Sequence, residues 1–319
     1  MKPILSSFAL IAAGLLAGYG VQLFAARGVF GPEPPIARLR SFLQRLVLLG
    51  LSPVTFIGAL WIVEIREPKI AWLAAIGAFC HVFGGAAAAL LAPLLRLDRP
   101  KAGAFFCCGF FTNVGAIGGL VVFLFLGEEG YAFVPVFKLL EELVYYGAGF
   151  PAARLYGDAG GKEERSLPAR LLRDPFFLVA LAGLVVGSAL NLSGVPRPAV
   201  FSSLNSLLIP LNTVILLSSI GMAMRFGRTG RYLGEGVAIM GLKFLLVPAV
   251  CTALARTAGL DGLPLKAVLI LSSMPVAFNS LIPPSLYGLD LDLANSCFLI
   301  SVLGLVLLLP GLHFILPLI

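Results

Sequence analysis

The feature that most constrains this chain is a series of long apolar stretches with few charged residues inside them. Each residue of a helix adds about 1.5 Å, so about 20 apolar residues are needed to cross the roughly 30 Å of hydrocarbon in a bilayer. We therefore predict an all-α membrane protein of about ten transmembrane helices. The predicted spans lie at about 3–26, 41–63, 69–95, 102–126, 132–156, 175–192, 198–224, 235–257, 264–288 and 292–316.

The composition excludes the main soluble classes of protein. Charged residues make up 12% of the 319 residues, hydrophobic residues make up 59%, and the mean hydropathy is +0.99. A soluble domain has about 25% charged residues, so most of this surface must face lipid. The net charge of +7 is spread between the apolar stretches, with no run of Lys and Arg among aromatic residues. We expect the lipid bilayer as a partner and no nucleic acid.

One polar linker, residues 157–174, separates two halves of five predicted spans each. We expect residues 1–156 to form a first five-helix repeat and residues 175–319 to form a second. An odd number of spans in each half requires the halves to have opposite orientations in the membrane. That is the arrangement of inverted-repeat carriers.

The basic residues predict which side of the membrane each connection occupies. If the spans alternate, six Lys and Arg lie on the side of the N-terminus and 15 on the other side. Lys138 and Lys243 inside spans complete the total of 23. Connections rich in Lys and Arg stay in the cytoplasm. We therefore expect a multi-pass protein of the cell (inner or plasma) membrane, with both termini outside and the linker in the cytoplasm.

The fourth and ninth predicted spans each contain an asparagine followed by helix breakers. Asn113 precedes Gly115, and Asn279 precedes Pro283. A break frees backbone groups that hydrocarbon cannot satisfy, so it persists where it faces protein or a wet cavity. A restarted helix presents free N–H groups and partial positive charge, which hold anions. These four residues are therefore candidate substrate-binding residues, although helix packing and simple kinks are the alternative for each span taken alone.

Four charged residues lie more than five residues from either end of a predicted span. A charge near the bilayer centre costs about 2.5–3.5 kcal/mol on insertion scales, so each should find a partner or water. Lys138 and Glu141 are three residues apart on one helix face and can pair with each other. Glu142 is then a candidate for proton coupling. Lys243 is either a counter-charge to an anionic substrate or a side chain that reaches back to the cytoplasmic face.

No sequence pattern indicates an enzyme or a metal site. The chain has no P-loop, no Gly-x-Ser-x-Gly turn and no His-Glu-x-x-His helix. We expect no catalysis, no resident cofactor and no metal, and coupling to protons or sodium stays open. The cysteines lie in apolar stretches without ligand spacing and predict small core residues rather than disulfides: Cys80, Cys107, Cys108, Cys251 and Cys297.

Two segments resemble the auxin efflux carrier family, which includes bacterial malate permease-like proteins. They are Phe-Thr-Asn-Val-Gly-Ala-Ile-Gly at 111–118, with Gly127 closing the span, and Ser-Met-Pro-Val-Ala-Phe-Asn at 273–279, followed by Tyr-Gly-Leu-Asp at 287–290. Gly119 departs from the family, which commonly has Pro at that position. The resemblance implies a five-plus-five inverted repeat in which spans four and nine cross at their breaks. It also implies a scaffold of spans one, two, six and seven beside a moving core, and organic carboxylates as substrates.

Together these observations predict a secondary transporter (permease) of small organic anions that works by alternating access. One alternative is a sodium-coupled symporter of the bile-acid type, which shares the implied fold, although no acidic cluster surrounds the predicted crossing. Another is a non-transporting membrane sensor, although the linker is too short for an output domain. A homodimer is left open.

The predicted orientation can be tested by labelling single cysteines on a background without the five native ones. Because basic residues hold connections in the cytoplasm, Pro3→Cys and Ile319→Cys should react with an impermeant maleimide in intact cells. Gly161→Cys should react only after the cells are permeabilised. Labelling of Gly161→Cys from outside would contradict the five-plus-five arrangement.

Overall fold

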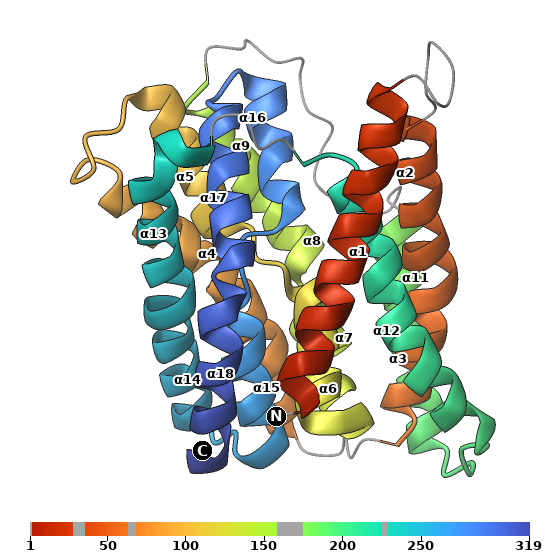
Figure 1. Cartoon of the computed structure of the whole chain (residues 1–319). Coiled ribbons are helices and arrows are strands. Elements are labelled where there is room, and N and C mark those ends of the chain that lie inside the picture. The colour runs from red at the N-terminus through yellow and green to blue at the C-terminus, as the bar shows by residue number, and fades with distance from the viewer. Residues whose placement is uncertain (1, 28–35, 63–67, 158–174, 225–228) are drawn as a thin grey trace. The chain divides into compact units, whose positions relative to one another are not determined.

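The computed structural model describes residues 2–27, 36–62, 68–157, 175–224 and 229–319, and in these ranges the regular structure is helical (Figure 1). Six helical segments are long and apolar enough to cross a membrane. A seventh is a pair of helices, Leu291–Leu303 and Leu305–Leu318, bent by 45°. The six are Lys2–Ala26, Ile36–Leu60, Lys69–Leu91, Val114–Tyr131, Val200–Gly221 and Thr229–Thr257.

The difference from the ten predicted spans comes from short or interrupted helices. Predicted span six is the shorter apolar helix Phe177–Leu192, and predicted span nine begins with the shorter helix Gly262–Ser272. Predicted span five is divided among four short helical pieces between residues 133 and 154. The chain is therefore a multi-span membrane protein. The predicted cytoplasmic linker, apart from Gly157, lies outside the described residues.

The chain forms two compact units, and both halves of the sequence contribute to each. Unit 1 comprises Met1–Pro68, Gly115–Pro135 and Pro175–Met224. It contains predicted spans one, two, six and seven, which the resemblance assigned to a scaffold, together with a segment from spans four and five. Its helices are α1 (Lys2–Ala26), α2 (Ile36–Arg45), η1 (Leu46–Leu51), α3 (Ser52–Leu60), α6 (Gly119–Tyr131), α11 (Pro175–Leu192) and α12 (Val200–Gly221).

Unit 2 comprises Lys69–Val114, Val136–Asp174 and Arg225–Ile319. Within the described residues, three helical elements continue from one unit into the other along the chain: η2 (Pro68–Ala71), η3 (Val114–Gly118) and α7 (Phe133–Phe137). The remaining helices of unit 2 are α4 (Trp72–Leu91), α5 (Arg99–Phe110), α8 (Glu141–Val144), η4 (Tyr145–Gly149), α9 (Phe150–Arg154), η5 (Thr229–Tyr232), α13 (Leu233–Gly241), η6 (Leu242–Leu246), α14 (Val247–Thr257), α15 (Gly262–Ser272), η7 (Phe278–Leu281), α16 (Ile282–Tyr287), α17 (Leu291–Leu303), α18 (Leu305–Ile315) and η8 (Leu316–Leu318).

Glycines bring α1 and α12 of unit 1 into backbone contact. Gly14 and Gly18 form a Gly-x-x-x-Gly pattern on α1, which lets helices approach closely in a membrane. A Cβ atom added at Gly18 would lie 1.9 Å from the Ser218 carbonyl oxygen of α12. A Cβ added at Gly221 of α12 would lie 2.2 Å from the Leu15 carbonyl oxygen of α1. Any larger side chain at these positions must therefore separate the two helices.

Glycines also join α4 to α5 in unit 2. A Cβ added at Gly84 would lie 2.4 Å from the Gly109 carbonyl oxygen, and one at Gly109 would lie 2.4 Å from the Gly84 carbonyl oxygen. The start of α5 is fixed by Asp98, whose carboxylate accepts hydrogen bonds from the Lys101 backbone N–H at 3.1 Å and from Lys101 Nζ at 2.7 Å. This tight pair of helices positions the residues that follow α5.

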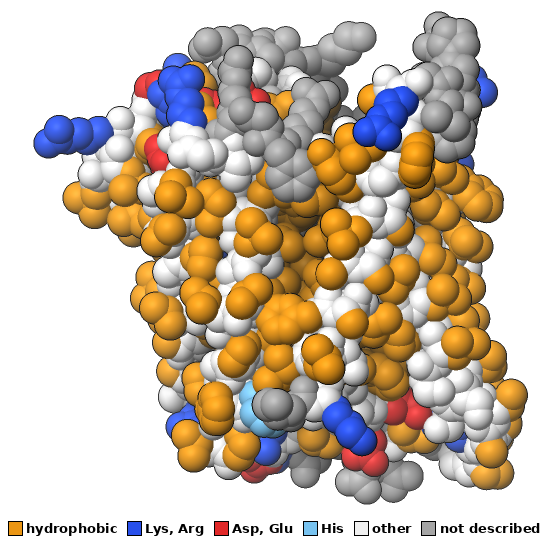
Figure 2. Space-filling model, viewed as in Figure 1, with side chains coloured by type: hydrophobic (Ala, Val, Ile, Leu, Met, Phe, Trp, Pro, Cys, Tyr) orange, Lys and Arg blue, Asp and Glu red, His pale blue; other side chains and the backbone are white. Residues whose placement is uncertain are grey.

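The surfaces of the helices are apolar, as lipid requires. Hydrophobic side chains cover the middle of the visible helices, while Lys, Arg, Asp and Glu lie towards the helix ends (Figure 2). Both units expose large apolar side chains: Leu5 of α1 is 73% exposed, Leu245 of η6 is 71% exposed and Phe314 of α18 is 72% exposed. Such a surface is stable against hydrocarbon and unfavourable against water.

The packing of α1 on α12 can be tested with two glycines of the same helix. Gly18→Ala should lower the free energy of unfolding by about 1–3 kcal/mol, because the new methyl group overpacks the contact with α12. Gly20→Ala is the matched control, because no heavy atom lies within 4 Å of its Cβ position. Thermal unfolding of the purified variants in detergent measures both. Equal melting temperatures would contradict the glycine contact.

Candidate functional site

The two broken helices of unit 2 pair with each other at their interruptions. Thr112, which follows α5, forms an isolated antiparallel bridge with Val276, which follows α15. The Asn113 N–H donates to the Pro275 carbonyl oxygen at 2.9 Å, and the Ala277 N–H donates to the Phe111 carbonyl oxygen at 3.0 Å. We call residues 111–113 and 275–277 the crossing. The two segments with asparagine and helix breakers therefore meet in space.

Neighbouring side chains satisfy other backbone groups that the breaks expose. Phe110 ends α5, and its carbonyl oxygen accepts a hydrogen bond from His81 Nδ1 of α4 at 3.0 Å. The Val276 N–H donates to Ser301 Oγ of α17 at 3.2 Å. Since a carbonyl oxygen can only accept, His81 carries its proton on Nδ1. These bonds explain how irregular backbone persists inside an apolar unit.

Lys243 is fully buried beside the crossing. It lies on η6, a π-helical segment of the kind that often marks functional sites. Its side chain is 0% exposed, and Nζ donates to Thr112 Oγ1 at 2.6 Å. Nζ also lies near Gly84 of α4, 3.7 Å from the position a Cβ would take there, which is an ordinary contact distance. Lys243 therefore does not reach back to the cytoplasmic face, which was one of the two alternatives from the sequence.

The counter-charge of Lys243 is missing from the described part of the chain. No described Asp or Glu lies within 4.0 Å of its Nζ, whereas Lys138 and Glu141 form an ion pair at 3.5 Å. Burial of an ammonium group without a counter-charge is unfavourable, and an ion pair or strong hydrogen bonds are normally needed to offset it. The crossing thus holds a buried ammonium group whose described hydrogen-bond partner is a neutral hydroxyl.

The predicted substrate-binding residues differ in burial. Asn113 is buried at the crossing, and Pro283 is buried in the first turn of α16. Asn279 is exposed on η7, three residues after Val276. Gly115 is exposed and begins the segment that packs in unit 1. The crossing therefore brings the backbone of Asn113 to the ninth predicted span, while the position of Asn279 leaves its carboxamide accessible.

The charged residues of predicted span five form a local pair, as the sequence indicated. Glu141 is buried and its carboxylate lies 3.5 Å from Lys138 Nζ. Glu142, the candidate for proton coupling, is half-buried on α8 and has interactions of its own. Its role in coupling stays a prediction.

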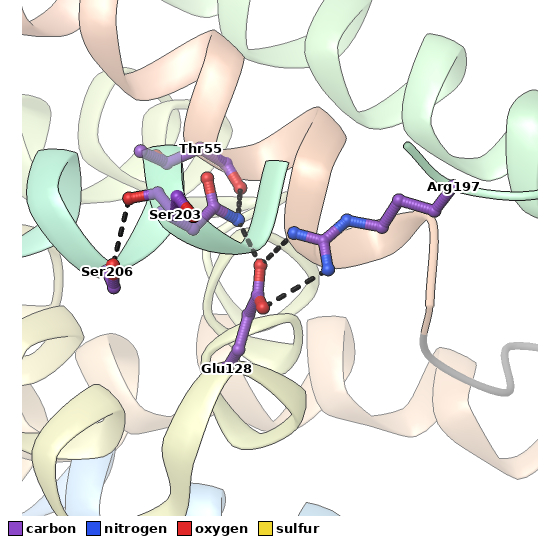
Figure 3. Close-up of polar contacts among 6 residues, drawn as sticks. Thr55, Glu128, Arg197, Ser203 and Ser206 are labelled. Carbon is purple, nitrogen blue, oxygen red and sulfur yellow. Dashed lines mark hydrogen bonds and ion pairs between the residues drawn. The ribbon is translucent and has the colours of Figure 1, made fainter. Parts of the chain in front are cut away.

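A second polar cluster, in unit 1, was not predicted from the sequence (Figure 3). Arg197 forms a bidentate ion pair with Glu128, and Asn205 donates from Nδ2 to Glu128 Oε1 at 2.6 Å. Asn205 Nδ2 also donates to the Thr55 carbonyl oxygen at 3.2 Å. No sequence pattern joins Glu128 to Arg197, which are 69 residues apart. Their one sequence signal is the glycine, Gly127, that directly precedes the acid.

Comparison with known proteins supports transport. Residues 162–313 match the family described as membrane transport protein, which is the auxin efflux carrier-like family, and this confirms the resemblance found in the sequence. An uncharacterized transporter of Methanothermobacter thermautotrophicus is 24% identical over 299 residues, which cover 92% of each chain. An uncharacterized transporter of Methanocaldococcus jannaschii is 27% identical over 241 residues, 72% of this chain and 74% of the relative.

The contact between Lys243 and the crossing can be tested at Thr112. Thr112→Val keeps the shape of the side chain but removes the oxygen that accepts from Nζ. A buried charged donor without an acceptor should lower the free energy of unfolding by about 1–3 kcal/mol. Thr112→Ser, which keeps the hydroxyl, is the matched control. Denaturation of both variants in detergent measures the effect, and equal losses would show that the hydrogen bond contributes nothing.

Proposed function

We propose that this chain, a membrane transporter of the membrane transport protein family, carries small organic anions by alternating access, with the substrate bound at the crossing. The observation that carries the proposal is Lys243, which is fully buried, donates to Thr112, and lacks a described carboxylate partner. A carboxylate substrate would supply the missing counter-charge. In a low-dielectric interior such a pair is stable only when both charges are well hydrogen-bonded.

Two further features of the crossing favour an anion. The helical segments η3 and η7 restart directly after the paired residues. The first N–H groups of a restarted helix have no acceptor within the helix, and the helix dipole adds partial positive charge. Asn113 and Asn279 would donate from their carboxamides, with Gly115 and Pro283 shaping the restarted backbone. The substrate would thus be held by dipoles and one fixed cation.

The proposed architecture is the five-plus-five inverted repeat predicted from the sequence. In this proposal both termini are outside the cell, and the linker is in the cytoplasm. The make-up of unit 1 supports it, because predicted spans one, two, six and seven pack together there. Substrate at the crossing would be exposed to each side in turn as the part that carries it moves, which is how repeat-based carriers alternate.

Uptake by proteoliposomes tests the proposal. Purified protein should accumulate one or more of labelled malate, succinate, lactate and acetate. Lys243→Met should lower the initial rate of uptake by at least about tenfold, because it removes the buried ammonium that would bind the carboxylate. Asn279→Ala should also lower the rate, because it removes a carboxamide that would donate to the substrate. An exposed carboxamide contributes little to packing, so this variant should still fold. Lys266→Met is the control, because Lys266 is a partly exposed lysine on α15, away from the crossing residues in sequence.

Imposed gradients in the same vesicles distinguish proton coupling from sodium coupling. If Glu142 carries the coupling proton, Glu142→Gln should lose proton-driven uptake and retain exchange of substrate between the two faces. Full uptake by Lys243→Met would contradict the proposed anion site. Uptake restricted to neutral solutes would contradict the substrate class.

A further inference from the structure

We propose that Arg197 and Asn205 form a second carboxylate-binding site, in unit 1, which the chain's own Glu128 occupies in this structure. A free small carboxylate would fill the site when Glu128 leaves it. Three donors converge on the Glu128 carboxylate: Arg197 Nη1, Arg197 Nη2 and Asn205 Nδ2. Two parallel N–H bonds from one guanidinium are the geometry by which arginine recognises carboxylates.

The donors are held in place by groups other than Glu128. The Arg197 guanidinium lies over the Phe201 ring, 6.0 Å from its centroid, and the Phe201 ring packs edge-on against Trp61 at 5.4 Å. Asn205 is 0% exposed and is fixed by the Thr55 carbonyl oxygen at 3.2 Å. The site is therefore preorganised, and loss of Glu128 would leave a formed cradle rather than two freely moving side chains.

A glycine on α3 lets Asn205 and Phe201 pack closely against that helix. A Cβ added at Gly58 of α3 would lie 2.9 Å from Asn205 Nδ2 and 3.0 Å from Phe201 Cδ1. No side chain on α3 thus competes for the space at this position. The arrangement requires residues from α3, α12 and the connection before α12, all within unit 1.

Glu128 does not use the full bonding capacity of the cradle. Arg197 Nε and Asn205 Oδ1 are both buried without a hydrogen-bond partner. An unmet buried donor costs about 1–3 kcal/mol. The unpartnered Arg197 Nε therefore shows that the guanidinium has donor capacity beyond what Glu128 uses.

The backbone allows Glu128 to withdraw. Gly127, directly before it, has φ 75° and ψ −168° inside α6, a conformation that favours glycine, so Glu128 is attached through a kink rather than a continuous helix. No heavy atom lies within 4 Å of the Cβ position of Gly127. The Glu128 and Arg197 side chains are 15% and 11% exposed, so the ion pair lies at the edge of the buried region. A solute can reach it once Glu128 moves.

The carboxylate site stands on this geometry alone, whereas its use in transport rests on the proposed function. In the topology proposed above, Arg197 lies on the outer side of the membrane. The site would then bind an anion on that side. Glu128 would return to the cradle when the anion leaves it and would keep the guanidinium paired between cycles.

Chemical rescue tests the site without any transport. Glu128→Ala removes the internal occupant and leaves the Arg197 guanidinium without its partner, so the variant should melt at a lower temperature than the wild type. Sodium acetate should restore the melting temperature in a saturable way, compared with sodium chloride at equal ionic strength. Glu129→Ala is the matched control, because Glu129 is an exposed carboxylate one residue away. It should show no acetate-specific shift.

Tryptophan fluorescence then measures binding by the folded protein. The chain has two tryptophans, Trp61 and Trp72, so on a Trp72→Phe background the signal reports on Trp61 beside the cradle. Succinate should change the fluorescence of Glu128→Ala with an affinity at least about tenfold tighter than that of the Glu128 form. Adding Arg197→Met to Glu128→Ala should abolish the change, and adding Lys243→Met should preserve it.

The outcomes separate this inference from the proposed function. If acetate rescues Glu128→Ala no better than chloride does, or if succinate binding is equal with and without Glu128, the cluster is only a structural ion pair and the inference is wrong. That result would leave Lys243-dependent uptake untouched. Conversely, rescue and Arg197-dependent binding would support the site even if Lys243→Met transported normally.

Discussion

Every unusual feature of this molecule depends on one constraint: inside hydrocarbon, a backbone N–H or carbonyl group must find a partner within the protein. A regular helix meets this constraint by itself, and a broken helix does not. Here two broken helices of unit 2 supply hydrogen-bond partners to each other, through the pairing of Thr112 with Val276. His81 and Ser301 each supply one further bond, to the Phe110 carbonyl oxygen and to the Val276 N–H. Part of the irregular backbone at the breaks is thereby hydrogen-bonded within the protein.

The protein treats buried charge in two different ways. In unit 1, Glu128 and Arg197 neutralise each other, and in unit 2, Lys138 and Glu141 do the same. Lys243 differs, since its described partner is a neutral hydroxyl. A charge that is already neutralised offers little electrostatic attraction to a solute, whereas an ammonium paired only with a hydroxyl does. This contrast favours the crossing over either ion pair as the proposed binding site for an anion.

Some of these features could be predicted from the sequence, because they depend on residues close together along the chain. The membrane class follows from apolar stretches, the breaks follow from Gly and Pro after an asparagine, and the pairing of Lys138 with Glu141 follows from helical spacing. The burial of Lys243 against Thr112 joins two residues that are distant in sequence, so the sequence left two alternatives open for this lysine. The pairing of Glu128 with Arg197 likewise joins two residues that each read as an ordinary charge at the end of a span. Helix interruptions also explain why the structure has six or seven long candidate spans, whereas the apolar stretches of the sequence predicted ten.

The interleaving of the two units has a consequence for how the protein is made. Unit 1 needs residues 175–224, so α1 emerges early in synthesis while its partner α12 is still missing. At about 5–20 residues per second, the ribosome adds the intervening chain in roughly 10–40 s. Throughout that interval the glycine face of α1 lies open, and a face built for close helix contact is attractive to any other helix nearby. The nascent first half must therefore be kept from mispairing, either by the insertion machinery or by its own temporary contacts, until the second half arrives.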